Sequence, residues 1–223
     1  MNRECFFCEE KLFSLNKSVG LACKDSIIFE DKNVFITPDI APLIEGHFLI
    51  VTKKHLTSFG GVNDQIYKSL KKAKKFLRST IYKNEKVLFF EHGSVVTKTA
   101  GACIDHAHIH AIPIVQDINV DKFMKEVVAE FITSEKQRAS RDTLMRCADN
   151  KQPYLFYEND EEAWYYPVDK LPSQLFRIMV AYYYTKTYNW KLSYQSPETK
   201  ELFKRTLALA KWSIDSQQQR INP

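Results

Sequence analysis

Alternating apolar and polar stretches in the first half of the chain predict short strands around one helix. Apolar runs that are bounded by turn-forming residues are typical of strands. They cover residues 26–30, 34–37, 48–52, 87–90 and 107–112. Asp31, Lys32 and Asn33 separate the first two runs and predict a hairpin turn there.

Between residues 63 and 82 the apolar positions change to the spacing of a helix. They would share one helix face, and they are Ile66, Leu70, Ala73, Leu77 and Ile81. The other faces carry Lys68, Lys71, Lys72, Lys74, Lys75 and Arg78. A basic run of this kind can bind nucleic acid, but it is more often a solvated helix face, which is the interpretation we adopt.

The pattern changes after Pro113. Helices are predicted over residues 121–135, from about residue 172 and from about residue 197. Two aromatic runs, at residues 154–157 and 163–166, flank an acidic segment and predict a hairpin. The sequence therefore predicts an α+β fold. Residues 1–115 would form an antiparallel sheet of about five strands with a packed helix, and residues 116–223 a mostly helical extension packed on this first domain.

Composition narrows the classes of protein. The chain has 223 residues, 44% of them hydrophobic and 13% aromatic, which is ample for a packed core. The net charge of +5 suits an anionic substrate, but it is too small to indicate nucleic acid. No apolar run reaches the roughly 18 residues that a membrane span needs, and the N-terminus is acidic where a signal peptide is apolar. We expect a soluble, cytoplasmic protein.

All six histidines lie between residues 47 and 110, and three of them alternate with apolar residues at the end of this interval. Residues two apart on a strand point to the same face, so His106, His108 and His110 would line one face together. A polar strand face in water fits less well, because histidine is not the usual residue there. A metal site is a second alternative, since alternate histidines can chelate one ion, although Asp105 is the one carboxylate beside them.

The segment from His106 to Ile112 resembles the signature of the histidine-triad (HIT) superfamily, H-φ-H-φ-H-φ-φ, at every position. Residues 27–31, 38–42, 46–51 and 53–55 resemble its nucleotide-binding half. Residues 91–93 and 101–105 resemble the segments that precede its triad. The resemblance covers roughly residues 5–113 and implies a HIT-like fold, while residues 171–177 look like a segment of longer bacterial members.

The resemblance implies catalytic roles for four histidines. His108 would attack the α-phosphate of a nucleotide and form a nucleotidyl-histidine intermediate, and His110 would contact the phosphate. His106 completes the triad, and His47 would support it from behind. The chemistry is plausible for these side chains, because a neutral imidazole is a competent nucleophile when its tautomer is held and donors stabilise the phosphoryl oxygens.

The resemblance also implies a nucleotide-binding set. Asp39 would accept hydrogen bonds from the ribose hydroxyls, and Ile27 and Phe29 would contact the base. Many members have Gln-Ser where this chain has Ala102 and Cys103, and the thiol of Cys103 is a weak donor.

Glu91 replaces a common Asn, and a carboxylate beside phosphates would repel them. We expect His92, or Gln174 and Arg177 of the extension, to supply the missing contacts. Gln174 and Arg177 are three residues apart and would share one helix face.

Cys5 and Cys8 form a C-x-x-C, a spacing at which two thiolates reach one metal ion. Five cysteines without a secretion signal argue against a disulfide framework, and a pair of free thiols is the alternative. Zinc-containing bacterial members of the superfamily resemble this chain here. They complete the set with the equivalents of His55 and His106, which implies a structural Zn²⁺.

The resulting prediction is a nucleotide-phosphate hydrolase, acting on dinucleoside polyphosphates or nucleoside phosphoramidates. The alternatives are a nucleotidyltransferase or phosphorylase of the same superfamily, a nucleotide-binding sensor with little turnover, and a metal-dependent hydrolase that uses the triad as ligands. The expected partner is a nucleotide, not a membrane or nucleic acid. Many superfamily members are homodimers, so a homodimer is one oligomeric state that the resemblance implies.

Overall fold

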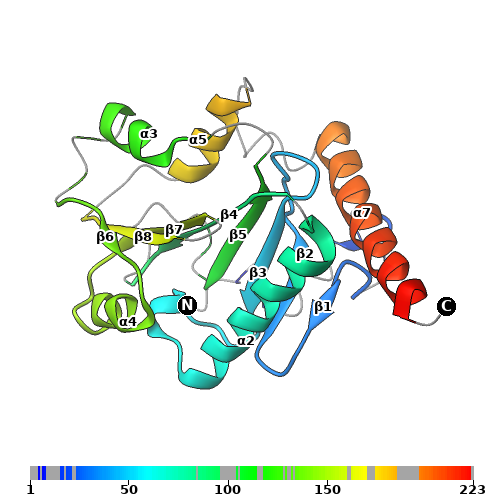
Figure 1. Ribbon diagram of the computed structural model, residues 1–223, viewed down its shortest axis with the longest axis horizontal. Helices are drawn as coiled ribbons and strands as arrows, with labels where there is room; N and C mark the ends of the chain where they lie inside the picture. The colour runs from blue at the N-terminus through cyan, green and yellow to red at the C-terminus, as the bar shows by residue number, and fades with distance from the viewer. Residues whose placement is uncertain are drawn as a thin grey trace.

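One antiparallel sheet runs through the computed structural model (Figure 1). Its eight strands lie in the order β1-β2-β3-β5-β4-β7-β8-β6. The structure describes residues 5, 7–8, 16–17, 19–21, 24–83, 85–95, 104, 106–114, 118–127, 129, 132, 134–159, 162–169, 174–184 and 196–221. The strands are β1 (Phe29–Glu30), β2 (Val34–Pro38), β3 (Phe48–Thr52), β4 (Val87–Gly93), β5 (His108–Pro113), β6 (Gln137–Arg138), β7 (Tyr154–Asn159) and β8 (Glu162–Pro167).

The sheet is larger than the five strands predicted, because the extension adds three. The aromatic hairpin is confirmed as β7 and β8. Strand β7 pairs with the edge of β4, in a register that runs from Leu88 opposite Asn159 to Gly93 opposite Tyr154. The extension is therefore less helical than expected. The sheet continues across residue 115, and the domain boundary that we placed there stays a prediction.

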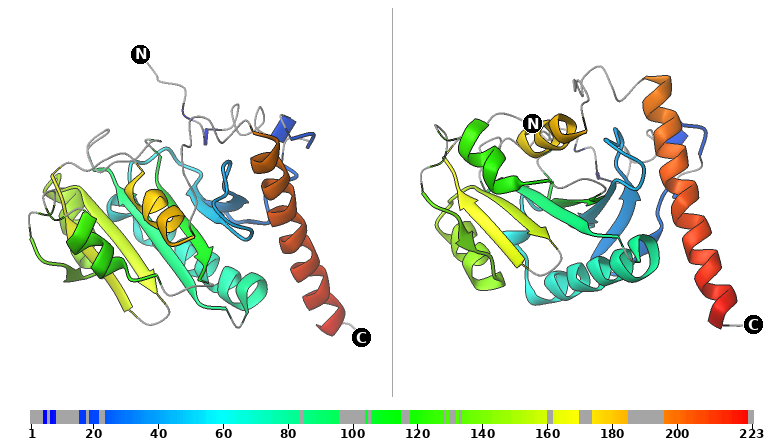
Figure 2. Two further views of the ribbon diagram at one scale, coloured as in Figure 1. Left: turned by 90° about the horizontal axis from the view of Figure 1, so that it is seen from above. Right: turned by 45° about the horizontal axis from the view of Figure 1, so that its top comes forward.

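Helices cover both faces of this sheet (Figure 2). They are α2 (Asp64–Phe76), α3 (Val120–Val127), α4 (Arg141–Asp149), α5 (Leu175–Tyr183) and α7 (Pro197–Ile221), with short turns η1 (Phe59–Gly61) and η2 (Leu77–Tyr82). The apolar side of α2 packs on one face, where alternate residues such as Phe89 and Ile109 point. Helices α3 and α5 pack on the other face around Leu88 and Phe90. This division separates the two sides of β4 and β5.

The long helix α7 packs on η2 and β2, near the loop between β2 and β3. Phe203 packs on Ile40 and Ala41 of that loop, and Thr206 accepts a hydrogen bond from the backbone N–H of Gly46 at 3.2 Å. The start of α7 agrees with the prediction at residue 197. Its contacts hold in place the loop that carries Asp39.

Helix α2 agrees with its predicted range, whereas α3 and α5 do not. Asn63 caps α2 by accepting from the N–H of Ile66, and η2 completes the predicted range to Tyr82 as a π-helical segment. Helix α3 is shorter than the predicted 121–135, and α5 begins at residue 175, not near 172. Helix α4 was not predicted, because only Leu144 and Cys147 in its nine residues are buried.

The strand predictions are closer. Strand β3 has the predicted limits, and the turn before β2 is confirmed by hydrogen bonds from the N–H groups of Asn33 and Val34 to Asp31. Strand β1 has two residues where five were predicted.

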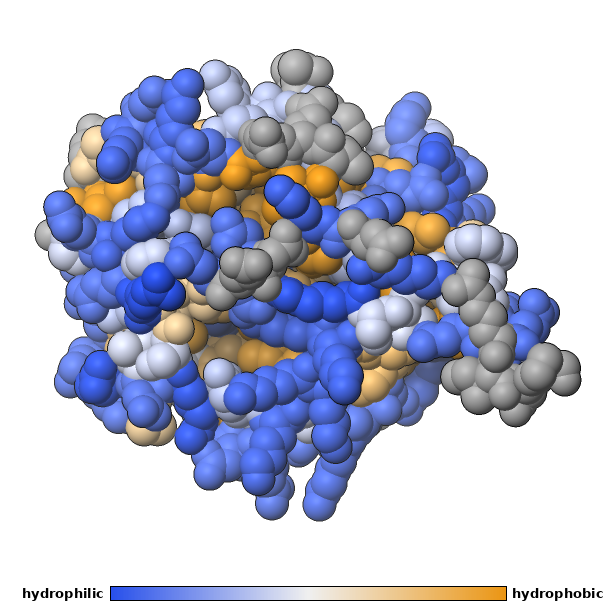
Figure 3. All heavy atoms as spheres, in the orientation of Figure 1, coloured by the Kyte–Doolittle hydropathy of each residue, from blue (hydrophilic) through white to orange (hydrophobic). Residues whose placement is uncertain are grey.

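None of the helices in the described part of the chain combines the length and apolar character that a membrane span requires. The face in Figure 3 is mainly hydrophilic, with apolar residues visible between polar ones.

Candidate active site

Strand β5 carries two of the three triad histidines. His108 and His110 both line one pocket, whereas Ile109 and Ala111 are buried on the α2 side. This is the alternation that the sequence predicted. His106 precedes the strand, does not line this pocket, and has a different set of neighbours.

A backbone carbonyl fixes the tautomer of His108. Its Nδ1 lies 2.6 Å from the carbonyl oxygen of His106. A carbonyl only accepts, so the proton of the neutral ring is on Nδ1 and the lone pair is on Nε2. Burial lowers the pKa of His108, which favours this neutral form at pH 7. His108 is therefore held as an imidazole with a nucleophilic Nε2.

A second chain of hydrogen bonds runs from Leu43 through His47 to His110. The backbone N–H of Leu43 donates to His47 Nδ1 at 3.2 Å, so the proton of neutral His47 is on Nε2. That Nε2 lies 2.9 Å from His110 Nδ1, and where it donates to this atom His110 carries its own proton on Nε2. Burial lowers the pKa of His47 to about 3 and that of His110 well below its usual range. In that form His110 offers a pocket ligand an N–H donor.

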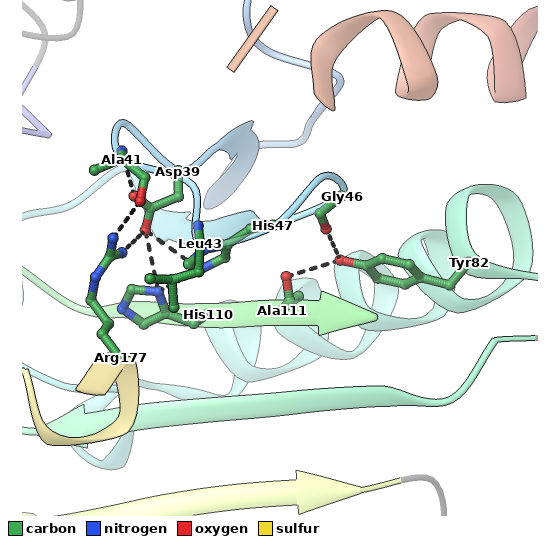
Figure 4. Close-up of polar contacts among 9 residues, drawn as sticks. All are labelled: Asp39, Ala41, Leu43, Gly46, His47, Tyr82, His110, Ala111 and Arg177. Carbon is green, nitrogen blue, oxygen red and sulfur yellow. Dashed lines mark hydrogen bonds and ion pairs between the residues drawn. The ribbon is translucent and has the colours of Figure 1, made fainter. Parts of the chain in front are cut away.

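Asp39 is joined to this chain and to the extension (Figure 4). Its Oδ1 accepts from the N–H of Ala41 at 2.7 Å, and its Oδ2 accepts from Arg177 Nη1 at 2.5 Å. Oδ2 also lies 3.3 Å from His110 Nδ1 and 3.5 Å from His47 Nε2. Burial alone would raise the pKa of Asp39, but the charge of Arg177 and the adjacent histidines hold it well below its usual range. Asp39 is an ionised, almost fully enclosed carboxylate.

The extension forms one wall of the pocket. Gln174 and Arg177 both line it, although Gln174 precedes α5 rather than sharing a helix face with Arg177. Arg177 also donates to the carbonyl oxygen of Ala41. His92 lines the pocket as well, and its Nε2 accepts from the N–H of Phe176 at 3.3 Å. Four predicted nucleotide-binding residues, Asp39 included, are therefore gathered around His108 and His110.

The apolar walls differ from the prediction. Phe7, Leu49 and Ile104 line the pocket, and the Phe7 ring lies 5.4 Å from that of His108. Ile27 packs in the same cluster as Phe7 and Leu49, beside the pocket. Phe29 lies elsewhere, because its ring packs on Phe76 of α2 at 5.1 Å.

The base contact expected for Phe29 stays a prediction, since its strand has only two residues and its face is not fixed by the sequence. Ala102 and Cys103 lie outside the described residues.

Glu91 corrects an expectation from the sequence. It was expected beside the phosphates, but β4 extends to Gly93, and Glu91 points to the α2 side while His92 lines the pocket. Its carboxyl accepts from the N–H of Phe59 at 2.7 Å and from the Tyr154 hydroxyl at 2.8 Å. Burial raises the pKa of Glu91 to about 7. Strand alternation would have given this result if the strand had been predicted at its full length.

The four predicted metal ligands lie together. One ligand atom from each of Cys5, Cys8, His55 and His106 lies within 4.8 Å of all the others. The Sγ of Cys5 lies 3.1 Å from His106 Nδ1, and the Sγ of Cys8 lies 3.6 Å from His55 Nδ1. His106 Nε2 lies 2.6 Å from the carbonyl oxygen of Thr52, so its proton is on Nε2 and its lone pair on Nδ1 faces the thiols. Two thiols and two imidazoles are a donor set that fits tetrahedral zinc.

A second group, Asp39, His47 and His110, also brings three ligand atoms within 4.8 Å. These atoms already bond one another, and Arg177 places a positive charge on the carboxylate. A cation here would have to displace that guanidinium, so this group is a poor site for a second ion.

Comparison with known proteins points to one family for part of the chain. Residues 22–117 match the HIT domain family. This match covers less than half of the chain, which is similar to HIT proteins over these residues. A HIT-like protein of unassigned function from Methanocaldococcus jannaschii is 27% identical over 139 residues, which are 55% of this chain and 98% of that protein. A HIT-like protein from Borreliella burgdorferi is 28% identical over 117 residues, 49% of this chain and 75% of that protein.

Among solved structures, the chain is similar to yeast Ap4A phosphorylase in complex with AMP. The TM-score is 0.41 and the identity 15%. The match covers 64% of this chain and 58% of the phosphorylase, which is less than two thirds of that chain.

Proposed function

We propose that this protein is a nucleotide-phosphate hydrolase that acts through a nucleotidyl intermediate on His108. The observation that carries the proposal is that His108 and His110 line one pocket, with His108 Nδ1 held by the carbonyl of His106 and His110 Nδ1 beside His47. His108 presents a lone pair on Nε2, and His110 carries a proton on Nε2 where His47 donates to it. A nucleophile and a donor for a phosphoryl oxygen are the two groups that a displacement at phosphorus requires.

The reaction would take two displacements. His108 Nε2 forms a bond to the α-phosphorus, and the bond from phosphorus to the leaving group, an oxygen in a polyphosphate or a nitrogen in a phosphoramidate, breaks with its electron pair. Water then forms a bond to phosphorus, the phosphorus–nitrogen bond breaks, and the nucleoside monophosphate and a proton are released with neutral His108 restored. The carbonyl of His106 stabilises the positive charge that the ring gains in the first step, because Nδ1 donates to it throughout.

The substrates we propose are dinucleoside polyphosphates or nucleoside phosphoramidates. A nucleotidyltransferase or phosphorylase would form the same intermediate and pass the nucleotide to another acceptor, such as phosphate, in place of water. A binding sensor would stop before the first displacement. Product analysis separates these alternatives.

We also propose that Cys5, Cys8, His55 and His106 hold a structural Zn²⁺. The ion would fix the N-terminal segment that brings Phe7 to the pocket wall. It would also fix the backbone of His106, whose carbonyl orients the nucleophile. Its contribution would be to folding and orientation, outside the phosphoryl displacement. A homodimer and a cytoplasmic location stay predictions.

The decisive experiment is a panel of ATP, diadenosine polyphosphates and adenosine phosphoramidate, with products identified by mass spectrometry. Intact protein is quenched at alkaline pH, where a phosphohistidine survives, and its mass is compared with that of His108→Asn. Release of AMP, with a nucleotidyl adduct on the wild type and none on the variant, supports the proposal. Turnover that persists in His108→Asn would overturn it.

A further inference from the structure

Gln174 is the residue by which the extension enters the pocket. It lies immediately before α5, with φ 68° and ψ 26°, and 6% of it is exposed. It lines the pocket with His108 and His110. Within the described part of the chain, its buried Oε1 has no hydrogen-bond partner.

Neither the left-handed backbone of Gln174 nor its unpaired Oε1 stabilises the folded protein. A left-handed conformation is uncommon for a residue with a side chain, and glycine would adopt it freely. A buried acceptor without a donor loses its bonds to water and gains none in return. Features of this kind persist at sites where a ligand supplies the missing hydrogen bond.

Other polar groups of the pocket are already engaged. Asp39 accepts from Ala41 and from Arg177 and is only 2% exposed. His92 Nε2 accepts from the N–H of Phe176. His108 Nε2 is reserved for phosphorus in the function proposed above. Among the described residues, Gln174 Oε1 is thus the pocket acceptor best placed to take a hydrogen bond from a substrate.

A substrate group that bonds to Gln174 Oε1 must be a hydrogen-bond donor, and few groups of a nucleotide are donors. Phosphate oxygens accept and do not donate at neutral pH, so the partner is not a phosphate. The hydroxyls of the ribose are the first donors along a nucleotide from its α-phosphate, and the N–H groups of the base are further away. The terminal amide of glutamine turns easily about its last side-chain bond, so Oε1 can face the pocket once a ligand enters.

We propose that Gln174 Oε1 accepts a hydrogen bond from a ribose hydroxyl of the bound nucleotide, so that the extension makes this protein selective for ribonucleotides. The inference rests on the proposed function for the position of the nucleotide. It assigns to Gln174 the recognition that the sequence suggested for Asp39, whose carboxylate is bound to Arg177. A site built around such a bond discriminates strongly against an analogue that lacks the hydroxyl.

The test compares ribo-, 2′-deoxy- and 3′-deoxyadenosine forms of the best substrate. The variants are Gln174→Met, which removes the acceptor at similar volume, Gln174→Glu, which retains one, and Gln174→Gly, which relieves the backbone strain. Exposed Ile178 on the same helix provides the control Ile178→Ala. We expect Gln174→Met and Gln174→Gly to lower kcat/KM for the ribonucleotide about tenfold, mainly through KM. Turnover of at least one deoxy form should not change, and Gln174→Glu should keep the ribose preference.

Equal losses for all three sugars, with unchanged melting temperature, would overturn the inference and leave the hydrolase proposal intact. Calorimetry tests whether the ribose contact exists without hydrolysis. It measures the affinities of His108→Asn and of the double variant His108→Asn/Gln174→Met for the three forms of AMP. Ribose-selective binding that depends on Gln174, without turnover by the wild type, would overturn the hydrolase alone. No binding of any nucleotide would overturn both.

Discussion

Arg177 and Asp39, 138 positions apart in the sequence, form a buried ion pair with 2.5 Å between Nη1 and Oδ2. The pair joins α5 of the extension to the loop after β2 of the HIT domain. Oδ2 also lies beside His47 and His110. The positive charge of the guanidinium therefore balances the negative charge of the carboxylate that adjoins these two histidines. The extension is thus part of the pocket's electrostatics.

Removing one member of this pair should destabilise the protein strongly. Arg177→Met leaves the Asp39 charge buried without its partner, and a loss of about 3 kcal/mol in the free energy of unfolding is expected. The double variant Arg177→Met/Asp39→Asn should lose less than the sum of the single changes. Urea unfolding measures all three. The exposed pair of Arg205 and Glu45 is the control, since Arg205→Met should cost less than about 1 kcal/mol.

His108→Asn should abolish turnover and leave nucleotide binding largely intact. Loss of a covalent nucleophile lowers kcat by far more than about 100-fold, whereas loss of a binding contact raises KM. Steady-state kinetics and calorimetric affinities give the two values. A variant that keeps more than about one hundredth of the wild-type kcat would show that His108 is not the nucleophile.

The protein should purify with one zinc ion per chain. Cys5→Ser and His55→Ala should lower both the zinc content and the melting temperature, because the energy of binding a structural zinc is part of the folding energy. Elemental analysis and calorimetry check these two effects. Cys147, a cysteine that is buried beside Leu144 and outside the cluster, provides the control Cys147→Ser, which should keep its zinc. Freshly purified, unchelated protein without metal would rule the site out.

Glu91 should make the stability depend on pH. Burial raises its pKa from the ordinary 4.5 to about 7, so the folded protein holds the proton more tightly than the unfolded chain. The stabilisation is complete below pH 4.5 and is lost as the pH rises through 7. The expected change is about 3 kcal/mol in the free energy of unfolding.

Urea unfolding between pH 4.5 and 8 tests this dependence against the variant Glu91→Gln, which cannot titrate. The wild type should lose stability over this range relative to the variant. The control is Glu201→Gln, a change on an exposed part of α7, which should keep the wild-type slope. Parallel curves for the wild type and Glu91→Gln would show that Glu91 is ionised at all these pH values.

The sequence by itself determined the features that depend on neighbours along the chain. Strand periodicity placed His108 and His110 on one face, and helical spacing gave α2. The aromatic hairpin also followed from local pattern. The family resemblance then supplied the expected roles of the histidines and the ligand set of the metal. The predictions from periodicity hold because side-chain direction within one element follows from its backbone geometry, whereas the roles of the histidines stay predictions.

The tertiary structure decided what depends on how distant elements meet. Pairing of β7 with β4 enlarged the sheet, and packing of α5 brought Arg177 to Asp39 and Gln174 into the pocket. The length of β4 turned Glu91 away from the site. Local pattern cannot predict such contacts, because an edge strand can pair with many strands and a helix can pack against many surfaces. Which partner is chosen depends on burial and charge balance across the whole fold.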